Sequence, residues 1–148
     1  MWLLLVMVAV SGVALNLPDQ VFRPVLKQIA TLSPSPLEIA ANLPPFDPKG
    51  AKLDWNGALD SARDEARRRG FAFTPRYVFY YAAYGAYGVG FSRAGEDGDN
   101  GLGNSYFYIS ARDGRILAGE IMGHGTAGDV FAQAQFPLHS GRIIGLPG

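Results

Sequence analysis

His139 is the residue whose type and position in this sequence most clearly allow chemistry. It is one of two histidines in 148 residues, and it follows Pro137 and precedes the small residues Ser140 and Gly141. A neutral imidazole is a common axial ligand of haem iron, and small neighbours let a flat macrocycle approach the backbone. A histidine at a membrane edge can instead bond to lipid headgroups or to backbone. The residues alone leave both interpretations open.

The remaining metal and hydrolytic patterns are weak. Cysteine is absent, which excludes disulfides, cysteine-ligated zinc and iron–sulfur clusters. The acidic segment 97–101 resembles a calcium loop, but its glycine comes one position early and Tyr108 stands where the closing glutamate is needed. Ser140 adjoins His139, and adjacent residues on a helix do not face each other. We therefore expect neither a metal site nor a hydrolytic arrangement.

The segment Gly123-His-Gly125-Thr-Ala-Gly128 fits the glycine string of dinucleotide-binding loops. The strand that precedes it belongs to a predicted meander, and no second parallel strand with an acidic residue follows, so the required context is missing. We expect a tight turn here.

Net charge is zero, so no long-range field favours nucleic acid, and no nucleic-acid partner is expected.

The N-terminal segment is apolar and carries no charge before Asp19. A spanning helix needs roughly 20 apolar residues. The basic start and the small-residue cleavage site of a signal peptide, which is the alternative, are both missing. We expect residues 1–17 to be a truncated transmembrane helix, so that the chain is an interior piece of a membrane protein. The sparse basic residues around the exit favour a non-cytoplasmic side.

Residues 18–52 are expected to join this helix to a folded domain. Apolar residues at helical spacing predict a short amphipathic helix that lies at the membrane surface or on the domain: Val21, Phe22, Val25, Leu26, Ile29 and Leu32. Prolines at 34, 36, 44, 45 and 48 then predict an extended linker over residues 33–52.

A second helix is predicted over residues 54–69, where Asp54 caps the start and Gly70 stops the end. Its apolar stripe consists of Trp55, Ala58, Leu59, Ala62 and Ala66. Acidic and basic residues one turn apart predict the ion pairs Asp60–Arg63, Asp64–Arg68 and Glu65–Arg69. These pairs favour a structural role for the arginines at 67–69 over a site for an anionic ligand.

From Arg76 onward the apolar period changes to two, which predicts strands near 76–84, 86–93, 104–111 and 115–121. Short connections, including a type I′ turn at Asp113-Gly114, demand antiparallel pairing. The predicted fold is therefore α+β, one helix packed on a four-stranded antiparallel meander, with Trp55 and Leu59 buried against the sheet. A final helix is expected from near Thr126 and is ended by Pro137.

Aromatic residues occur on both faces of these predicted strands, and a single helix can cover only one face of the sheet. The second face of the sheet could meet the membrane surface, a sister domain or a flat ligand, or it could be an ordinary core with tyrosines at its rim. The expected organisation is a domain over residues 53–136, followed by the start of the next transmembrane helix over residues 137–148.

The chain resembles the PepSY-associated transmembrane family, which includes iron-regulated inner-membrane proteins linked to ferric-siderophore reduction. The matching segments are Ser11–Leu17, Val21–Pro24, Trp55–Gly70, Asp113-Gly114, Phe136–Gly141 and Gly145–Gly148. The most specific is Leu138-His139-Ser140-Gly141 beside a glycine-rich helix start.

The resemblance implies a PepSY-like periplasmic domain of a bacterial inner-membrane protein that carries haem b and passes electrons to a ferric siderophore. His139 would match a family histidine suited to haem ligation, whereas His124 matches no ligand. The implied partners are the lipid bilayer and the remaining membrane helices of the parent protein, and this piece alone would be inactive and hold no haem. The alternative is a non-catalytic PepSY module that binds a protein or a ligand.

Overall fold

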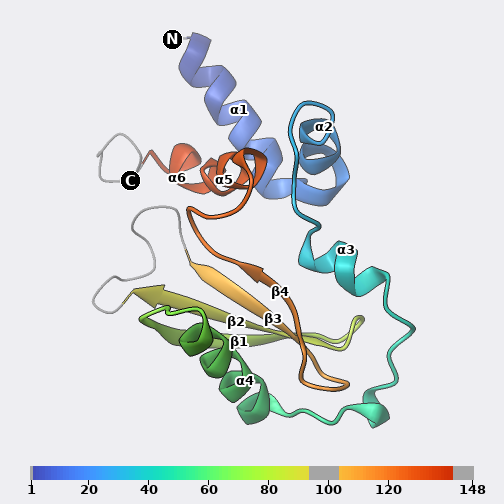
Figure 1. The fold of residues 1–148 in the computed structure, drawn as a ribbon. Coiled ribbons are helices and arrows are strands. Elements are labelled where there is room, and N and C mark those ends of the chain that lie inside the picture. The colour runs from blue at the N-terminus through green and yellow to red at the C-terminus, as the bar shows by residue number, and fades with distance from the viewer. Residues whose placement is uncertain (1, 94–103, 142–148) are drawn as a thin grey trace. The chain divides into compact units, whose positions relative to one another are not determined.

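The structure is a computed structural model that describes residues 2–93 and 104–141. The described residues divide into two compact units (Figure 1). The helical unit comprises residues 2–33 and 122–141, and the sheet unit comprises residues 34–93 and 104–121. The acidic segment 97–101 lies outside the described residues.

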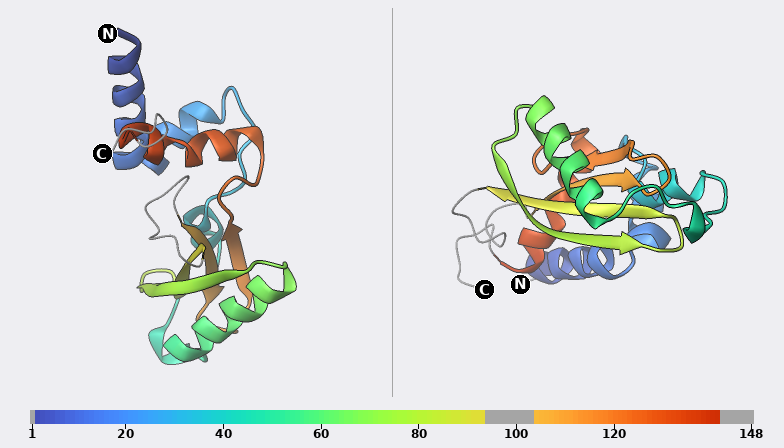
Figure 2. Two further views of the ribbon diagram at one scale, coloured as in Figure 1. Left: turned by 90° about the vertical axis from the view of Figure 1, so that its left-hand side faces the viewer. Right: turned by 90° about the horizontal axis from the view of Figure 1, so that it is seen from below.

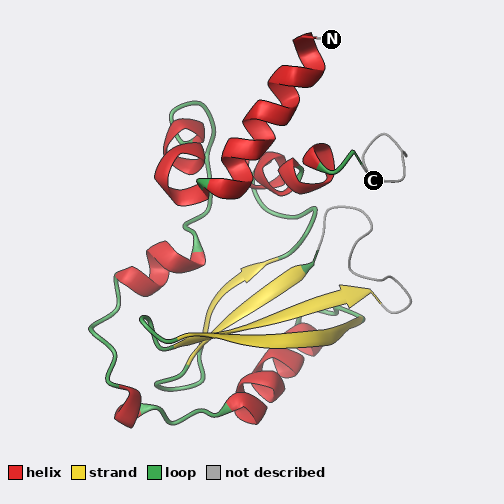
Figure 3. Ribbon diagram, turned by 180° about the vertical axis from the view of Figure 1, so that it is seen from behind, coloured by secondary structure: helices red, strands yellow, loops and turns green. Residues whose placement is uncertain are grey.

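The sheet unit contains four antiparallel strands in the order β1-β2-β3-β4 (Figure 3). The strands are β1 Phe73–Tyr81, β2 Ala86–Arg93, β3 Ser105–Ser110 and β4 Ile116–Glu120. The predicted α+β class with a four-stranded antiparallel sheet is confirmed. Strand β1 lies earlier in the chain than predicted, because residues 82–85 form the turn that ends in Gly85 at a φ of 59°.

The β3–β4 turn differs from the prediction. Gly114 has a φ of 76°, but no non-glycine residue in the described part of the chain has a positive φ. A type I′ turn needs positive φ at both central residues. The predicted type I′ geometry at Asp113-Gly114 is therefore wrong, and glycine alone supplies the left-handed position.

Helix α4, Trp55–Arg68, lies across one face of the sheet (Figure 2). The Asp54 side chain caps it by accepting a hydrogen bond from Gly57 N, as predicted. Its buried row is made of small residues, Ala58, Ala62 and Ala66. These alanines pack on an apolar cluster that includes Val89, Phe91, Phe107 and Ile109. Small side chains on the helix let its backbone approach the bulky residues of the strands.

The predicted burial of Trp55 and Leu59 is wrong. Trp55 is 52% exposed, and its ring meets the rings of Tyr80 and Tyr87 edge-on, at 6.1 and 5.2 Å between centroids. Leu59 is half-buried. The alanine row points at the middle of the sheet, so the larger residues of the same stripe fall at the rim of the interface.

The ion pairs of α4 largely follow the prediction. Arg63 lies 3.2 Å from Asp60, and Arg69 Nε lies 2.5 Å from Glu65 Oε1. The predicted Asp64–Arg68 pair is wrong, because Asp64 pairs with Arg67 and Arg68 pairs with Glu65. The Glu65 carboxylate is buried between two guanidinium groups, which explains the arginine run as a structural feature.

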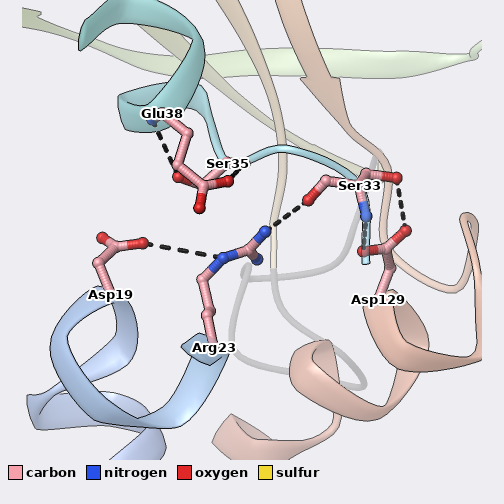
Figure 4. A network of polar contacts seen from close by, with 6 residues as sticks. All are labelled: Asp19, Arg23, Ser33, Ser35, Glu38 and Asp129. Atoms are coloured by element: carbon pink, nitrogen blue, oxygen red, sulfur yellow. Dashed lines mark hydrogen bonds and ion pairs between the residues drawn. The ribbon is translucent and has the colours of Figure 1, made fainter. Parts of the chain in front are cut away.

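Residues 33–52 are more ordered than an extended linker. They contain helix α3, Pro36–Ala41, and a 3-10 turn η2, Pro48–Gly50. Ser35 and Glu38 form a reciprocal capping box at the start of α3 (Figure 4). Pro36 occupies the first helical position, where its missing N–H costs nothing. The predicted extended linker is therefore wrong for these two segments.

The helical unit contains α1 Trp2–Asn16, the π-helical turn η1 Pro18–Phe22, α2 Arg23–Leu26, α5 Ala127–Gln133 and α6 Gln135–His139. Phe22 and Leu26 form a small core with Ala14. The predicted end of the last helix at Pro137 is wrong. Helix α6 begins at Gln135, so Pro137 lies in its first turn, where proline is tolerated.

No single helix among the described residues has both the length and the apolar character to cross a membrane; the stretch from Leu4 to Leu26 meets these criteria only as two helical parts bent by 107°.

Candidate functional site

His139 lies at the end of α6, beside α1 in the helical unit. Its Nδ1 is 3.0 Å from the Oγ of Ser11, which lies in the middle of α1. Ser11 is completely buried, whereas the His139 side chain is exposed. The structure thus connects the predicted ligand to a polar group of an otherwise apolar helix.

The imidazole of His139 has a polar partner at one ring nitrogen and a small residue beside it. Ser11 is the only hydrogen-bond partner of the imidazole in the described part of the chain, and it uses Nδ1. Gly12 lies beside the ring, and a Cβ at this position would make an ordinary van der Waals contact with Cε1 at 3.8 Å. An exposed imidazole with Nδ1 hydrogen-bonded and small neighbours fits an axial ligand that binds iron through Nε2.

The rest of the ligand set is not found in the described residues. Within 2–93 and 104–141, no group of three or more His, Cys, Asp or Glu could hold a metal ion. His124 lies in the turn between β4 and α5, where its backbone carbonyl accepts a hydrogen bond from Gln133. His139 is therefore the only predicted haem ligand among the residues that the structure describes.

A polar network fixes the chain around Ser33 (Figure 4). Both oxygens of the Asp129 carboxylate accept hydrogen bonds from Ser33, from its backbone N at 2.9 Å and from its Oγ at 2.7 Å. The Arg23 guanidinium donates to the Ser33 carbonyl and pairs with Asp19 at 3.8 Å. These contacts hold residues 23, 33 and 129 together within the helical unit.

Asp129 also starts helix α5. It forms a reciprocal capping box with Thr126, whose hydroxyl in turn donates to the Thr31 carbonyl at 2.6 Å. Partial burial acts to raise the pKa of Asp129, but the hydrogen bonds from Ser33 and Thr126 outweigh burial and hold the pKa below its ordinary value. The carboxylate is therefore charged at neutral pH and is a structural anchor of this unit.

Aromatic side chains cover the face of the sheet opposite α4, and we call them the tyrosine face: Tyr77, Phe79, Tyr81, Tyr106 and Tyr108. Two glycines of β2 make room for them. A Cβ on Gly88 would lie 2.1 Å from the Phe79 ring, and one on Gly90 would lie 2.7 Å from the Tyr77 ring. The alternation of glycine with large residues in β2 is thus explained by aromatic rings seated on the glycines.

The hydroxyls of the tyrosine face are hydrogen-bonded to one another and to a carboxylate. Tyr77 and Tyr106 share a 2.6 Å hydrogen bond, and Tyr108 donates to Glu120 at 3.3 Å. Burial raises the pKa of Tyr108, and the Glu120 charge adds to this effect. Burial and the bond to Tyr77 likewise raise the pKa of Tyr106. Both phenols therefore stay protonated and act as hydrogen-bond donors or acceptors rather than as anions.

The sequence singles out His139 as a candidate ligand, which stays a prediction, and it gives no indication of the bond to Ser11 or of the network around Asp129. The capping boxes had a visible signal, because Ser35-Pro-Leu-Glu38 and Thr126-Ala-Gly-Asp129 both carry the spacing of the motif. Ser11 had a weaker signal as a small polar residue inside an apolar helix. Its partner lies 128 positions away, and no local pattern connects the two.

Comparison with protein-family models and with the sequences of curated proteins finds no match to this chain.

Proposed function

We propose that this chain supplies a PepSY-like periplasmic domain and one haem ligand to a bacterial inner-membrane electron-transfer protein that reduces ferric siderophores during iron uptake. The observation that carries the proposal is the position of His139. Its imidazole is hydrogen-bonded through Nδ1 to the buried Ser11 of an uncharged helix, and His139 as a whole residue is exposed. A positioned imidazole beside an apolar helix suits an axial haem ligand.

The surface of α1 supports contact with lipid or with further helices of the parent protein. The helix contains no charged residue. Most of its exposed side chains are large and apolar: Trp2, Leu4, Leu5, Val6, Val8, Val10, Val13 and Leu15. Apolar surface of this extent around a helix is typical of a membrane or protein contact.

The residues of this chain would contribute binding and orientation. Bound haem b would supply the one-electron chemistry. His139 would hold the iron, and Gly12 is a small neighbour of its imidazole ring. The apolar side chains of α1 would exclude water from this region, which influences the reduction potential of an iron centre. The second ligand would come from the remaining helices of the parent protein.

The haem absorption spectrum of the intact parent protein tests this proposal. We expect His139→Ala to abolish the low-spin haem band of the purified protein in detergent. The matched control is His124→Ala, which removes the other histidine from an exposed turn and should leave the band unchanged. A low-spin band that persists in His139→Ala would rule out His139 as a ligand.

A non-catalytic binding module is the second candidate, and the tyrosine face favours it. Tyr77 and Tyr81 are exposed, and hydroxyl groups line an otherwise aromatic surface. Aromatic residues with polar tips are common at binding surfaces. Purification of the intact protein without any haem absorption, together with a ligand that quenches tyrosine emission, would favour this candidate over electron transfer.

A further inference from the structure

Ser11 Oγ makes three close polar contacts, although its hydroxyl group has only one hydrogen to donate. The oxygen lies 2.8 Å from the Met7 carbonyl, 3.1 Å from the Val8 carbonyl and 3.0 Å from His139 Nδ1. Ser11 is completely buried, so its polar atom depends on protein partners. A hydroxyl has one hydrogen to donate and two lone pairs to accept with.

The two carbonyl oxygens decide where this hydrogen points. A carbonyl can only accept, so a hydroxyl at these distances must donate to one of them or share its hydrogen between them. Serine in a helix commonly donates back to the preceding turn in this way. If the hydroxyl donated to His139 instead, both carbonyls would face hydroxyl lone pairs at close range in a buried site, which is unfavourable. The hydroxyl therefore accepts from the imidazole.

We infer that Ser11 is a positioning residue that holds His139 in the tautomer with hydrogen on Nδ1 and leaves the Nε2 lone pair free to bind haem iron. The hydrogen bond at one ring nitrogen sets the protonation of the other. An outer partner of this kind orients a metal-binding imidazole and tunes its basicity. The assignment of iron as the ligand rests on the proposed function, whereas the tautomer does not.

The first experiment measures the tautomer without haem. Long-range ¹H–¹⁵N correlation spectra of the 148-residue chain in detergent micelles, labelled at histidine nitrogens, distinguish the two ring nitrogens. The spectra are recorded at alkaline pH, where ordinary imidazole is neutral. We expect the Nδ1–H form for His139 in the unmodified chain. Ser11→Ala should shift the population toward Nε2–H, the form that free imidazole prefers.

Ser140→Ala is the matched control. Ser140 is adjacent to His139 in sequence, but its hydroxyl bonds to the Pro137 carbonyl at 3.4 Å and not to the imidazole. This variant should keep the Nδ1–H form. A predominant Nε2–H form in the unmodified chain would overturn the inference without any variant. An Nδ1–H form that persists in Ser11→Ala would overturn it as well.

The second experiment uses added hemin as the probe. We expect Ser11→Ala to weaken hemin binding by the intact parent protein in detergent about tenfold, the lower end of the range for loss of an outer partner of a ligating histidine. The parent protein with Ser140→Ala should bind hemin like the unmodified parent protein. Equal affinities for Ser11→Ala and Ser140→Ala would overturn the positioning role.

The two proposals fail in different ways. If the parent protein with His139→Ala binds hemin as tightly as the unmodified parent protein, the ligand assignment under the proposed function is wrong. The tautomer measurement is independent of hemin and would still decide the role of Ser11.

Discussion

Asp129 shows how much one carboxylate contributes to the helical unit. Its side chain caps α5 and also accepts two hydrogen bonds from Ser33, the last residue of the unit before the chain enters α3. Thr126 makes a parallel connection to Thr31. The strand-to-helix turn at 122–126 and the segment at 31–33 are therefore held side by side by side-chain hydrogen bonds rather than by a sheet.

The first prediction concerns the acid stability of this unit. The pKa of Asp129 is lower in the folded state than its ordinary value. The stabilisation is therefore fully present above pH of about 4 and is lost as pH falls through the folded pKa. We expect Asp129→Asn to be less stable than the unmodified chain at neutral pH and to show a shallower loss of helical circular dichroism between neutral and acid pH.

Thr126→Ser provides the control, because it keeps the hydroxyl that caps α5 and should reproduce the acid profile of the unmodified chain. An identical pH dependence for Asp129→Asn and the unmodified chain would show that the network contributes no pH-dependent stability.

In α4, only the alanines of the predicted apolar stripe are buried against the sheet. The alanines of α4 face the cluster around Val89 and Phe107, while the aromatic rings of the tyrosine face occupy the opposite side of the sheet. The hairpin between β3 and β4 is tied to the segment that precedes α4. Arg112 donates to the carbonyls of Pro44 and Pro45, and its guanidinium lies 5.0 Å from the centre of the Phe46 ring.

The second prediction separates the buried row from the rim of α4. Ala62 is fully buried, so Ala62→Leu should overpack the interface and cost about 1–3 kcal/mol of unfolding free energy. Leu59 is half-buried, so Leu59→Ala should cost less than the ~2–5 kcal/mol of a fully enclosed leucine.

Chemical denaturation followed by tryptophan emission measures both variants, because Trp55 contacts Tyr80 and Tyr87 in the sheet unit and reports on its unfolding. A variant with Trp2→Phe removes the second tryptophan and serves as the common background. A larger loss for Leu59→Ala than for Ala62→Leu would contradict the alanine row as the centre of the interface.

At the scale of the whole molecule, the two units differ in the apolar side chains that they expose. The helical unit exposes large apolar residues from α1 and from the segment after it, including Val25 and Ile29. The sheet unit has its own apolar core under α4. Large exposed apolar surface is a feature of the helical unit, and it is the surface that the proposed function assigns to contact with lipid or with further helices.

The third prediction follows from this division. Residues 34–121 expressed alone should be more soluble than residues 1–148, since the exposed apolar side chains of α1 are absent. Soluble yield without detergent and the oligomer size in light scattering measure the difference. Equal solubility of the two proteins would count against contact of α1 with a membrane or with other helices.

The local patterns of the sequence determined the class of the sheet unit and the helix that covers it. The change from a helical period to a period of two appears directly in the residues, and short connections between strands allow only antiparallel pairing. Asp54 and Gly70 bracket α4 for local reasons of capping and termination, so its bounds were also predictable to within a residue.

Tertiary structure alone decided which side chains became partners. His139 could be chosen from its residue type and neighbours, but its bond to Ser11 joins residues 128 positions apart. Asp129 and Ser33 are 96 positions apart. Likewise, Trp55 and Ala62 belong to one apolar stripe, and only packing against the strands placed the first at the rim and the second in the core. Sequence periodicity specifies the direction of a side chain on its own element, whereas its partner depends on how distant elements pack.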